Sequence, residues 1–213
     1  MIFALPYYGI RLLALRDLRE RCKACRALVL TFDDAYENFY ADVFPLLHEM
    51  SLPATLYVPI GFVEGAAPAP IRGTEQLPAC SWEQLREMLA TGLVTVGSHT
   101  CSHPNLKRLG PPAAEAELRD SRHILEDRLG SAVDSFCYPK GLWSRRLEAL
   151  VAKYYRTAMV GGGRRNTPRR WSPLRLSRVP IRRDMDASLL SLLSAPVWLE
   201  EWMANWVRGY VRV

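Results

Sequence analysis

The chain has 213 residues, of which 49% are hydrophobic and 23% are charged, a composition typical of a soluble globular protein. This length fits one domain with a substantial core, and no run of apolar residues is long enough to span a membrane. The net charge of +6 favours an anionic partner, such as an acidic glycan or phospholipid head groups. The basic residues are scattered and are not interleaved with aromatic residues, so we expect no nucleic acid among the partners.

The cysteines and the first residues bear on where the protein works. Five cysteines cannot all pair within one chain, and Cys22 and Cys25 lack the second pair of ligands that a structural zinc site needs. An odd, unpatterned set of cysteines favours a reducing compartment. The N-terminal segment is interrupted by Pro6 and is too short for a secretory signal. We therefore expect a cytoplasmic protein, with membrane association and a longer parent chain as open alternatives.

Hydrophobic periodicity and turn residues predict strands and helices in alternation. Strands are expected at residues 28–31, 54–58, 93–97, 135–137, 157–160 and 176–179. Helices are expected at residues 11–21, 36–50, 82–91, 112–129 and 142–154. Ser81 and Gln84 form a predicted capping box for the third of these helices. Residues 60–80 form a Gly-, Ala- and Pro-rich loop, long enough to cover or flank a site. This alternation predicts βα units and a parallel sheet.

Two carboxylates and two histidines follow two of the predicted strands. Asp33 and Asp34 come directly after the first strand, where adjacent like charges raise each other's pKa. His99 and His103 follow the third strand, and one turn of chain can aim both imidazoles at a single ion. An ion held by Asp34, His99 and His103 has three protein ligands and an open position for water, as in catalytic zinc sites. Such an ion resolves the charge conflict and leaves Asp33 beside it as a base.

Three segments resemble the first three motifs of the polysaccharide deacetylases, the NodB-homology carbohydrate esterases. They are Thr31 to Asp34 (TFDD), Ser98 to His103 (SHTCSH) and Tyr138 to Gly141 (YPKG), in the order and spacing of the family. The resemblance extends from about residue 12 to about residue 180. It implies an α/β fold, a distorted parallel (β/α) barrel with about seven strands and an active site at their carboxyl ends. Family members usually carry an extra strand before the first motif, and this chain starts late enough to lack that first N-terminal strand.

The resemblance also implies a function. It implies a metal-dependent hydrolase that removes N-acetyl groups from amino sugars in a polysaccharide or a glycan precursor, with an N-acetylated glycan as the substrate. One divalent ion, zinc before cobalt or nickel, lowers the pKa of a bound water in such enzymes and polarises the acetyl carbonyl. Two alternatives stay open. One is an esterase that removes O-acetyl groups from a polysaccharide, and the other is a catalytically weak barrel that binds or assembles glycans.

Each site residue receives a role from the same resemblance. Asp33 is the expected general base, and Asp34, His99 and His103 are the expected metal ligands. The backbone N–H of Tyr138 is assigned as a second oxyanion donor. Pro139 and Gly141 suit a loop that presses against the substrate, since proline lacks an N–H and glycine permits a tight turn.

Three departures from the family pattern qualify these roles. Ala35 stands where the family usually has Gly. Cys137 stands where the third motif often begins with an Arg that orients the base. No histidine follows His123, although many family members supply a late histidine as the general acid. Arg178 is a catalytic candidate that replaces the missing Arg and pairs with Asp33, with a surface salt bridge as the alternative.

The C-terminal residues have a pattern of their own. Trp198, Trp202 and Trp206 recur every four residues, which places them on one face of a helix. We expect a catalytic domain at residues 1–185 and a Trp-rich helix at residues 186–213. That helix either packs on the barrel or lies at an interface, as a peripheral membrane or protein contact.

Overall fold

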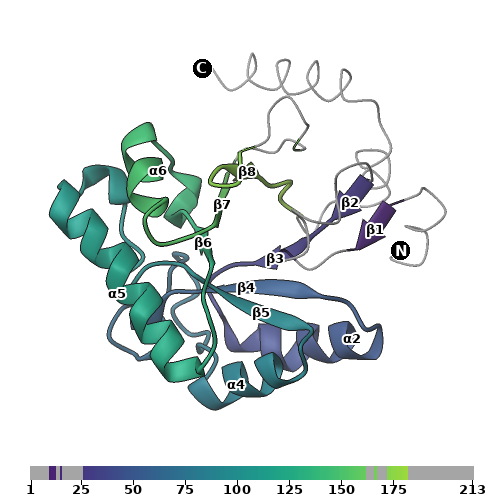
Figure 1. Ribbon diagram of the computed structural model, residues 1–213. Helices are drawn as coiled ribbons and strands as arrows, with labels where there is room; N and C mark the ends of the chain where they lie inside the picture. The colour runs from purple at the N-terminus through teal and green to yellow at the C-terminus, as the bar shows by residue number, and fades with distance from the viewer. Residues whose placement is uncertain (1–9, 13–14, 16–25, 162–165, 167–171, 182–213) are drawn as a thin grey trace, which may run out of the picture.

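A curled parallel sheet forms the centre of the protein (Figure 1). The computed structural model describes residues 10–12, 15, 26–161, 166 and 172–181. Six strands cross the main sheet in the order in which they occur in the chain, and every pairing is parallel. They are β3 (Leu30–Phe32), β4 (Ala54–Val58), β5 (Val94–Ser98), β6 (Ser135–Cys137), β7 (Thr157–Val160) and β8 (Leu176–Ser177). The predicted parallel barrel-like architecture is confirmed, with six strands in the main sheet where about seven were expected.

A second sheet of two strands lies at the start of the described chain. Its strands, β1 (Ile10–Leu12) and β2 (Arg26–Leu28), pair in parallel. Val29 separates β2 from β3, so the strand predicted at residues 28–31 is split in two. The sequence is compatible with a chain that lacks a strand before the first motif, but in the structure β1 and β2 both precede that motif. The helix predicted at residues 11–21 is wrong at its start, because residues 10–12 pair with β2 instead. Of residues 13–21, only residue 15 is among those that the structure describes.

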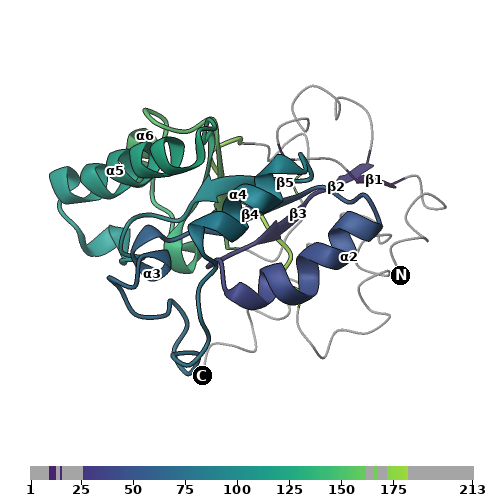
Figure 2. The ribbon, with the colours of Figure 1, turned by 90° about the horizontal axis from the view of Figure 1, so that it is seen from below.

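Helices cover the outer face of the curled sheet, as two views at right angles show (Figures 1 and 2). The α-helices are α2 (Phe44–Glu49), α3 (Ile60–Val63), α4 (Trp82–Ala90), α5 (Pro111–Leu129) and α6 (Arg145–Val151). Shorter helical segments are η4 (Phe39–Val43), η5 (Leu106–Arg108) and η6 (Pro139–Gly141). The helix predicted at residues 36–50 is present, with the π-helical η4 leading into α2. The loop predicted at residues 60–80 begins with the single turn of α3.

Capping residues set the ends of three helices. Ser81 Oγ accepts from the Gln84 N–H at 3.2 Å, and Gln84 Oε1 accepts from the Ser81 N–H at 2.8 Å, which confirms the predicted capping box of α4. Gly130, at φ 63°, closes α5 with a left-handed cap. Ser144 Oγ caps α6, so that helix begins at Arg145 and not at the predicted residue 142.

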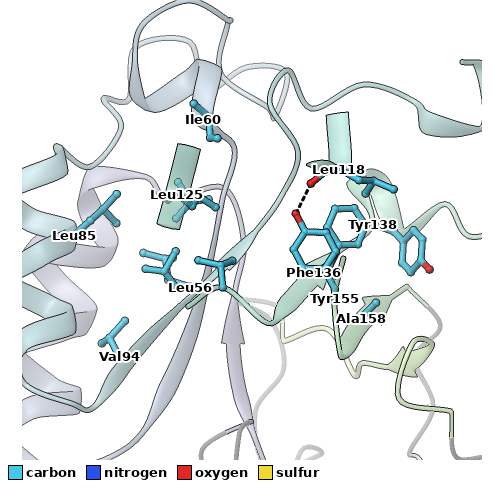
Figure 3. Close-up of a cluster of buried hydrophobic side chains, with 14 of the residues drawn as sticks. Leu56, Ile60, Leu85, Val94, Leu118, Leu125, Phe136, Tyr138, Tyr155 and Ala158 are labelled. Carbon is cyan, nitrogen blue, oxygen red and sulfur yellow. Dashed lines mark hydrogen bonds between the residues drawn. The ribbon is translucent and has the colours of Figure 1, made fainter. Parts of the chain in front are cut away.

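The main hydrophobic core lies between the outer face of the sheet and these helices (Figure 3). Leu56, Val94 and Phe136 extend from three strands into one cluster with Leu85 of α4 and Leu125 of α5. Each of these five side chains is at most 1% exposed. Full burial of such a side chain stabilises the fold by about 1.5–3 kcal/mol. The core therefore holds α4 and α5 firmly against the strands whose ends carry the polar motifs.

A smaller apolar cluster occupies the opposite face of the sheet. Tyr57, Cys137, Met159 and Leu176 come from four strands and pack with Leu15. Successive residues of a strand point to opposite faces, so this cluster lies on the side away from the helices.

Several sequence predictions fall outside the described residues. They concern Cys22 and Cys25, the domain boundary at residue 185 and the Trp-rich helix at residues 186–213. In the part of the chain that the structure describes, Cys80, Cys101 and Cys137 are free thiols. No helix in that part combines the length and the apolar character that crossing a membrane requires.

Candidate active site

The predicted site residues come together at one edge of the main sheet. Asp33 and Asp34 follow β3, His99 follows β5, and Arg178 follows β8. All the strands of the sheet are parallel, so their carboxyl ends meet at this edge. Active sites of parallel barrels lie at the same place.

Asp34, His99 and His103 form a compact group. Asp34 Oδ1 lies 3.5 Å from His99 Nε2 and 3.7 Å from His103 Nε2, and the ligand atoms of the three residues are all within 4.8 Å of one another. Asp34 and His99 are buried, and the His103 side chain is 12% exposed. Asp34 and His103 adopt left-handed backbone conformations, with φ values of 75° and 53°. Such conformations are costly for residues other than glycine and recur at functional sites.

The hydrogen bonds of this group fit a bound cation. His99 Nδ1 lies 2.7 Å from the carbonyl oxygen of Cys137. A carbonyl oxygen only accepts, so Nδ1 carries the proton and Nε2 turns its lone pair towards Asp34. Asp34 Oδ1 is buried and has no hydrogen-bond partner. A buried carboxylate oxygen without a donor is costly, and a divalent ion between it and the imidazoles removes that cost.

The electrostatics of the three residues agree with this fit. Burial, with the charge of Asp33 added to it, raises the pKa of Asp34 to about 7 when no ion is bound. Burial and the neighbouring His99 and Lys140 lower the pKa of His103 to about 4, and burial lowers the pKa of His99. Both histidines are therefore neutral near pH 7, which is the form that binds metals.

Asp33 is held by Arg178. The guanidinium makes two hydrogen bonds to the carboxylate, from Nη1 to Oδ1 and from Nη2 to Oδ2, each 2.6 Å long. Nη1 also donates to Thr31 Oγ1 at 3.4 Å. Burial raises the pKa of Asp33, but the hydrogen bonds and charge of Arg178 and the proximity of His99 outweigh it, so the net pKa lies below the ordinary value. Asp33 is thus ionised at neutral pH.

Cys137 lies beside this ion pair. Its buried Sγ lies 3.2 Å from Arg178 Nη2 and 3.6 Å from Asp33 Oδ2. Burial raises the pKa of the Cys137 thiol well above its ordinary value, so the thiol is neutral and the positive charge beside Asp33 comes from Arg178. The predicted pairing of Arg178 with Asp33 is confirmed. The alternative of a surface salt bridge is wrong, since the Arg178 side chain is only 23% exposed.

The loop after β6 corrects one assignment. The Tyr138 N–H donates to the Met159 carbonyl at 3.0 Å, so it is not available as an oxyanion donor and that prediction is wrong. This bond belongs to the parallel pairing of β6 with β7, in which Cys137 lies opposite Met159. Pro139 has no N–H, and the Gly141 N–H donates to the Tyr138 carbonyl at 2.8 Å. Among the described residues, no acceptor is found for the Lys140 N–H.

Gly141 is required where it stands. Its φ is 66°, and a Cβ at this position would lie 2.6 Å from the backbone nitrogen of Gly161. The predicted tight turn at Gly141 is therefore present in η6, where Pro139 is buried. The charge of Lys140, also in η6, acts on His103.

Sequence reasoning missed two groups near the site. The motifs assign no role to Lys140, although its charge acts on His103. Glu117 of α5 accepts hydrogen bonds from the segment between the two histidines and belongs to no motif. Its only sign in the sequence is its spacing of four residues from Ser121, which places both on one face of a helix.

Comparisons with known proteins agree with the fold. A model of the polysaccharide deacetylase family matches residues 20–159. The poly-β-1,6-N-acetyl-D-glucosamine N-deacetylase of Escherichia coli strain K12 is 38% identical over 80 residues, which cover 35% of this chain and 12% of that protein. The match thus spans a small part of that relative's length.

Two solved structures have the same fold. The Streptococcus pyogenes deacetylase PplD, solved in complex with acetate, superposes with a TM-score of 0.75 at 23% identity, over 92% of this chain and 84% of that one. IcaB from Ammonifex degensii gives a TM-score of 0.74 at 22% identity, over 91% and 86% of the two chains.

Proposed function

This chain belongs to the polysaccharide deacetylase family, and from that membership we propose that it is a metal-dependent hydrolase that removes N-acetyl groups from amino sugars in a glycan. One observation supports the proposal above the others. A three-residue group suited to a divalent ion, Asp34 with His99 and His103, lies beside a carboxylate, Asp33, that is kept ionised by Arg178. Hydrolysis of an amide needs an activated water, a base for its proton and stabilisation of the oxyanion.

Asp34, His99 and His103 would hold the ion, with zinc the first candidate and cobalt or nickel as alternatives. When bound, a divalent ion lowers the pKa of a water and polarises a carbonyl oxygen. His99 is suited to ligation because the Cys137 carbonyl fixes its Nδ1 proton and leaves Nε2 free.

Asp33 would act as the general base. It is ionised at neutral pH, and the two hydrogen bonds from Arg178 fix the orientation of its carboxylate. It would take the proton of the attacking water as the water oxygen bonds to the acetyl carbon. The Lys140 N–H would donate to the acetyl oxygen as negative charge develops on it.

The leaving amine needs a proton when the C–N bond breaks. No histidine follows His123 to serve as a separate acid. Protonated Asp33 would return to the leaving nitrogen the proton that it took from water. The reaction then balances: one water enters, the free amine and acetic acid leave, and the acid releases its proton to solvent as acetate.

The substrate class follows from the relatives. The E. coli relative is a poly-β-1,6-N-acetyl-D-glucosamine N-deacetylase, so we propose an N-acetylglucosamine polymer or oligomer as the substrate. The test uses β-1,6-linked and β-1,4-linked N-acetylglucosamine oligomers with the purified full chain, first stripped of metal and then supplied with zinc or cobalt.

Release of acetate with a matching gain of free amine, only after metal is added, is the expected result. Release of acetate from O-acetylated sugars alone would overturn N-deacetylation in favour of the esterase. No release from any acetylated glycan in the presence of metal would overturn the hydrolase itself.

A further inference from the structure

One face of α5 holds the segment that carries both histidines. Ser121 Oγ lies 2.8 Å from the Oγ of Ser98, the residue before His99. Glu117, one helical turn earlier on the same face, contacts the other end of the segment, next to His103. The segment is therefore attached to the helix at two points, with His99 beside the first and His103 beside the second.

Glu117 makes three hydrogen bonds to this segment. Its Oε2 accepts from the backbone N–H groups of Cys101 at 2.8 Å and Ser102 at 3.0 Å. Its Oε1 accepts from Ser102 Oγ at 2.6 Å. Glu117 forms no ion pair with any residue that the structure describes, so its charge is directed at these donors. Hydrogen bonds to an ionised acceptor are the stronger kind.

The segment needs such support because its backbone is strained. Thr100 has a φ of 73° and His103 a φ of 53°, so the chain turns twice through the left-handed region within four residues. These turns bring the His99 and His103 rings to 4.7 Å between centroids. Residues held in sparsely populated conformations persist only when their surroundings fix them.

We infer that Glu117 is a positioning residue that holds His103 at the distance from Asp34 and His99 at which the three can share one ion. The inference rests on the proposed metal centre and adds a residue outside the family motifs. Glu117 does not touch the ion; it acts through the backbone of Cys101 and Ser102. Groups that orient metal ligands commonly change metal affinity by about 10- to 100-fold when they are removed.

Glu115 provides a matched control. It lies on the same helix two residues earlier and also makes two side-chain hydrogen bonds, from Lys153 Nζ at 2.9 Å and from Tyr154 OH at 2.8 Å. Both partners lie in the turn that follows α6, away from the histidine segment. Removing Glu115 therefore reports the cost of losing a glutamate from α5 without disturbing a metal ligand.

The experiment measures the zinc dissociation constant of the metal-free full chain by calorimetry, so it does not depend on activity. Glu117→Ala should weaken zinc binding by about 10- to 100-fold, whereas Glu115→Ala should leave it at the wild-type value. Glu117→Gln should restore most of the affinity. Its amide oxygen can accept from both N–H groups, and its NH2 can donate to the Ser102 hydroxyl.

Wild-type zinc affinity in Glu117→Ala, or an equal loss in Glu115→Ala, would overturn the inference while leaving the metal centre in place. Should Glu117→Ala fail to fold, Glu117→Asp decides. It keeps the charge on a shorter side chain that no longer reaches the loop, so wild-type affinity in that variant would overturn the inference. A wild-type chain that binds no zinc would instead overturn the proposed metal centre, and the positioning role with it.

Discussion

Arg178 and Asp33 lie 145 residues apart in the sequence and are joined by two hydrogen bonds of 2.6 Å each. Asp33 follows β3 and Arg178 follows β8, which are the two edge strands of the main sheet. The pair therefore links the two edge strands, which the curl of the sheet brings towards each other. A contact that orients the proposed base also connects the first and last strands of the sheet.

Arg178→Met should reduce turnover and move the acidic limb of the pH–rate profile to higher pH. The guanidinium lowers the pKa of Asp33, and burial alone raises it. Without Arg178, the base therefore becomes protonated at a higher pH, and activity is lost earlier as the pH falls. A positioned base contributes about 10²–10⁴-fold to the rate, and turnover should fall by up to this factor. Metal content should not change.

Arg175→Met is the control for this experiment, since the Arg175 guanidinium lies over the Trp143 ring at 4.7 Å from its centroid and has no part in the proposed base. An Arg178→Met enzyme with the wild-type pH profile would show that Arg178 does not tune Asp33.

Asp33→Asn should abolish turnover and keep the metal. Asparagine preserves the shape of the side chain but cannot take a proton from water, so the loss should reach about 10²–10⁴-fold. The expected ligands, Asp34, His99 and His103, are untouched. Turnover and zinc content measured on the same preparation check both halves of the prediction. A parental rate in this variant would mean that another group is the base.

The sequence could predict those parts of the site whose positions depend on a strand and on the residues that follow it. Asp33 and Asp34 end a short β-branched strand, and His99 and His103 end another, so parallel pairing alone brings the two pairs to one edge. Arg178 could be predicted because Cys137 stands where the family often has an arginine, and Arg178 follows a later strand. The order of the strands and the directions of their ends suffice for the two aspartates and the two histidines, whereas the inference on Arg178 also needs the resemblance to the family pattern.

The parts that could not be predicted depend on which segments pair in space. The Tyr138 N–H is used by the Met159 carbonyl, and nothing in the motif shows how far β6 remains paired with β7. Residues 10–12 have an apolar pattern compatible with a helix, but they form a strand because they pair with β2. Glu117 reaches its partners across 15 or 16 residues from a helix whose rotation follows from core packing.

His99→Ala and His103→Ala should each lose the bound ion. Each variant removes one of three ligands, and the buried Asp34 with a single imidazole is a poor site for a divalent cation. Elemental analysis after dialysis against zinc measures the stoichiometry, expected to be one ion per chain in the parent. His123→Ala, on α5 and outside the group, should keep the ion. Full occupancy in both His99→Ala and His103→Ala would place the metal elsewhere.

Gly97→Ala should destabilise the fold. Gly97 lies in β5 under the Tyr57 ring, and a Cβ there would come within 2.4 Å of Tyr57 Cε1 and 2.6 Å of Ser135 Oγ. Tyr57 is fully buried among its neighbours and cannot move aside. Overpacking of this kind costs about 1–3 kcal/mol, which should lower the melting temperature measurably. Gly161→Ala is the comparison, because its Cβ would meet Gly141 Cα at an ordinary 3.5 Å. Equal melting temperatures for the two variants would contradict the close approach of Tyr57 to the strand that leads to His99.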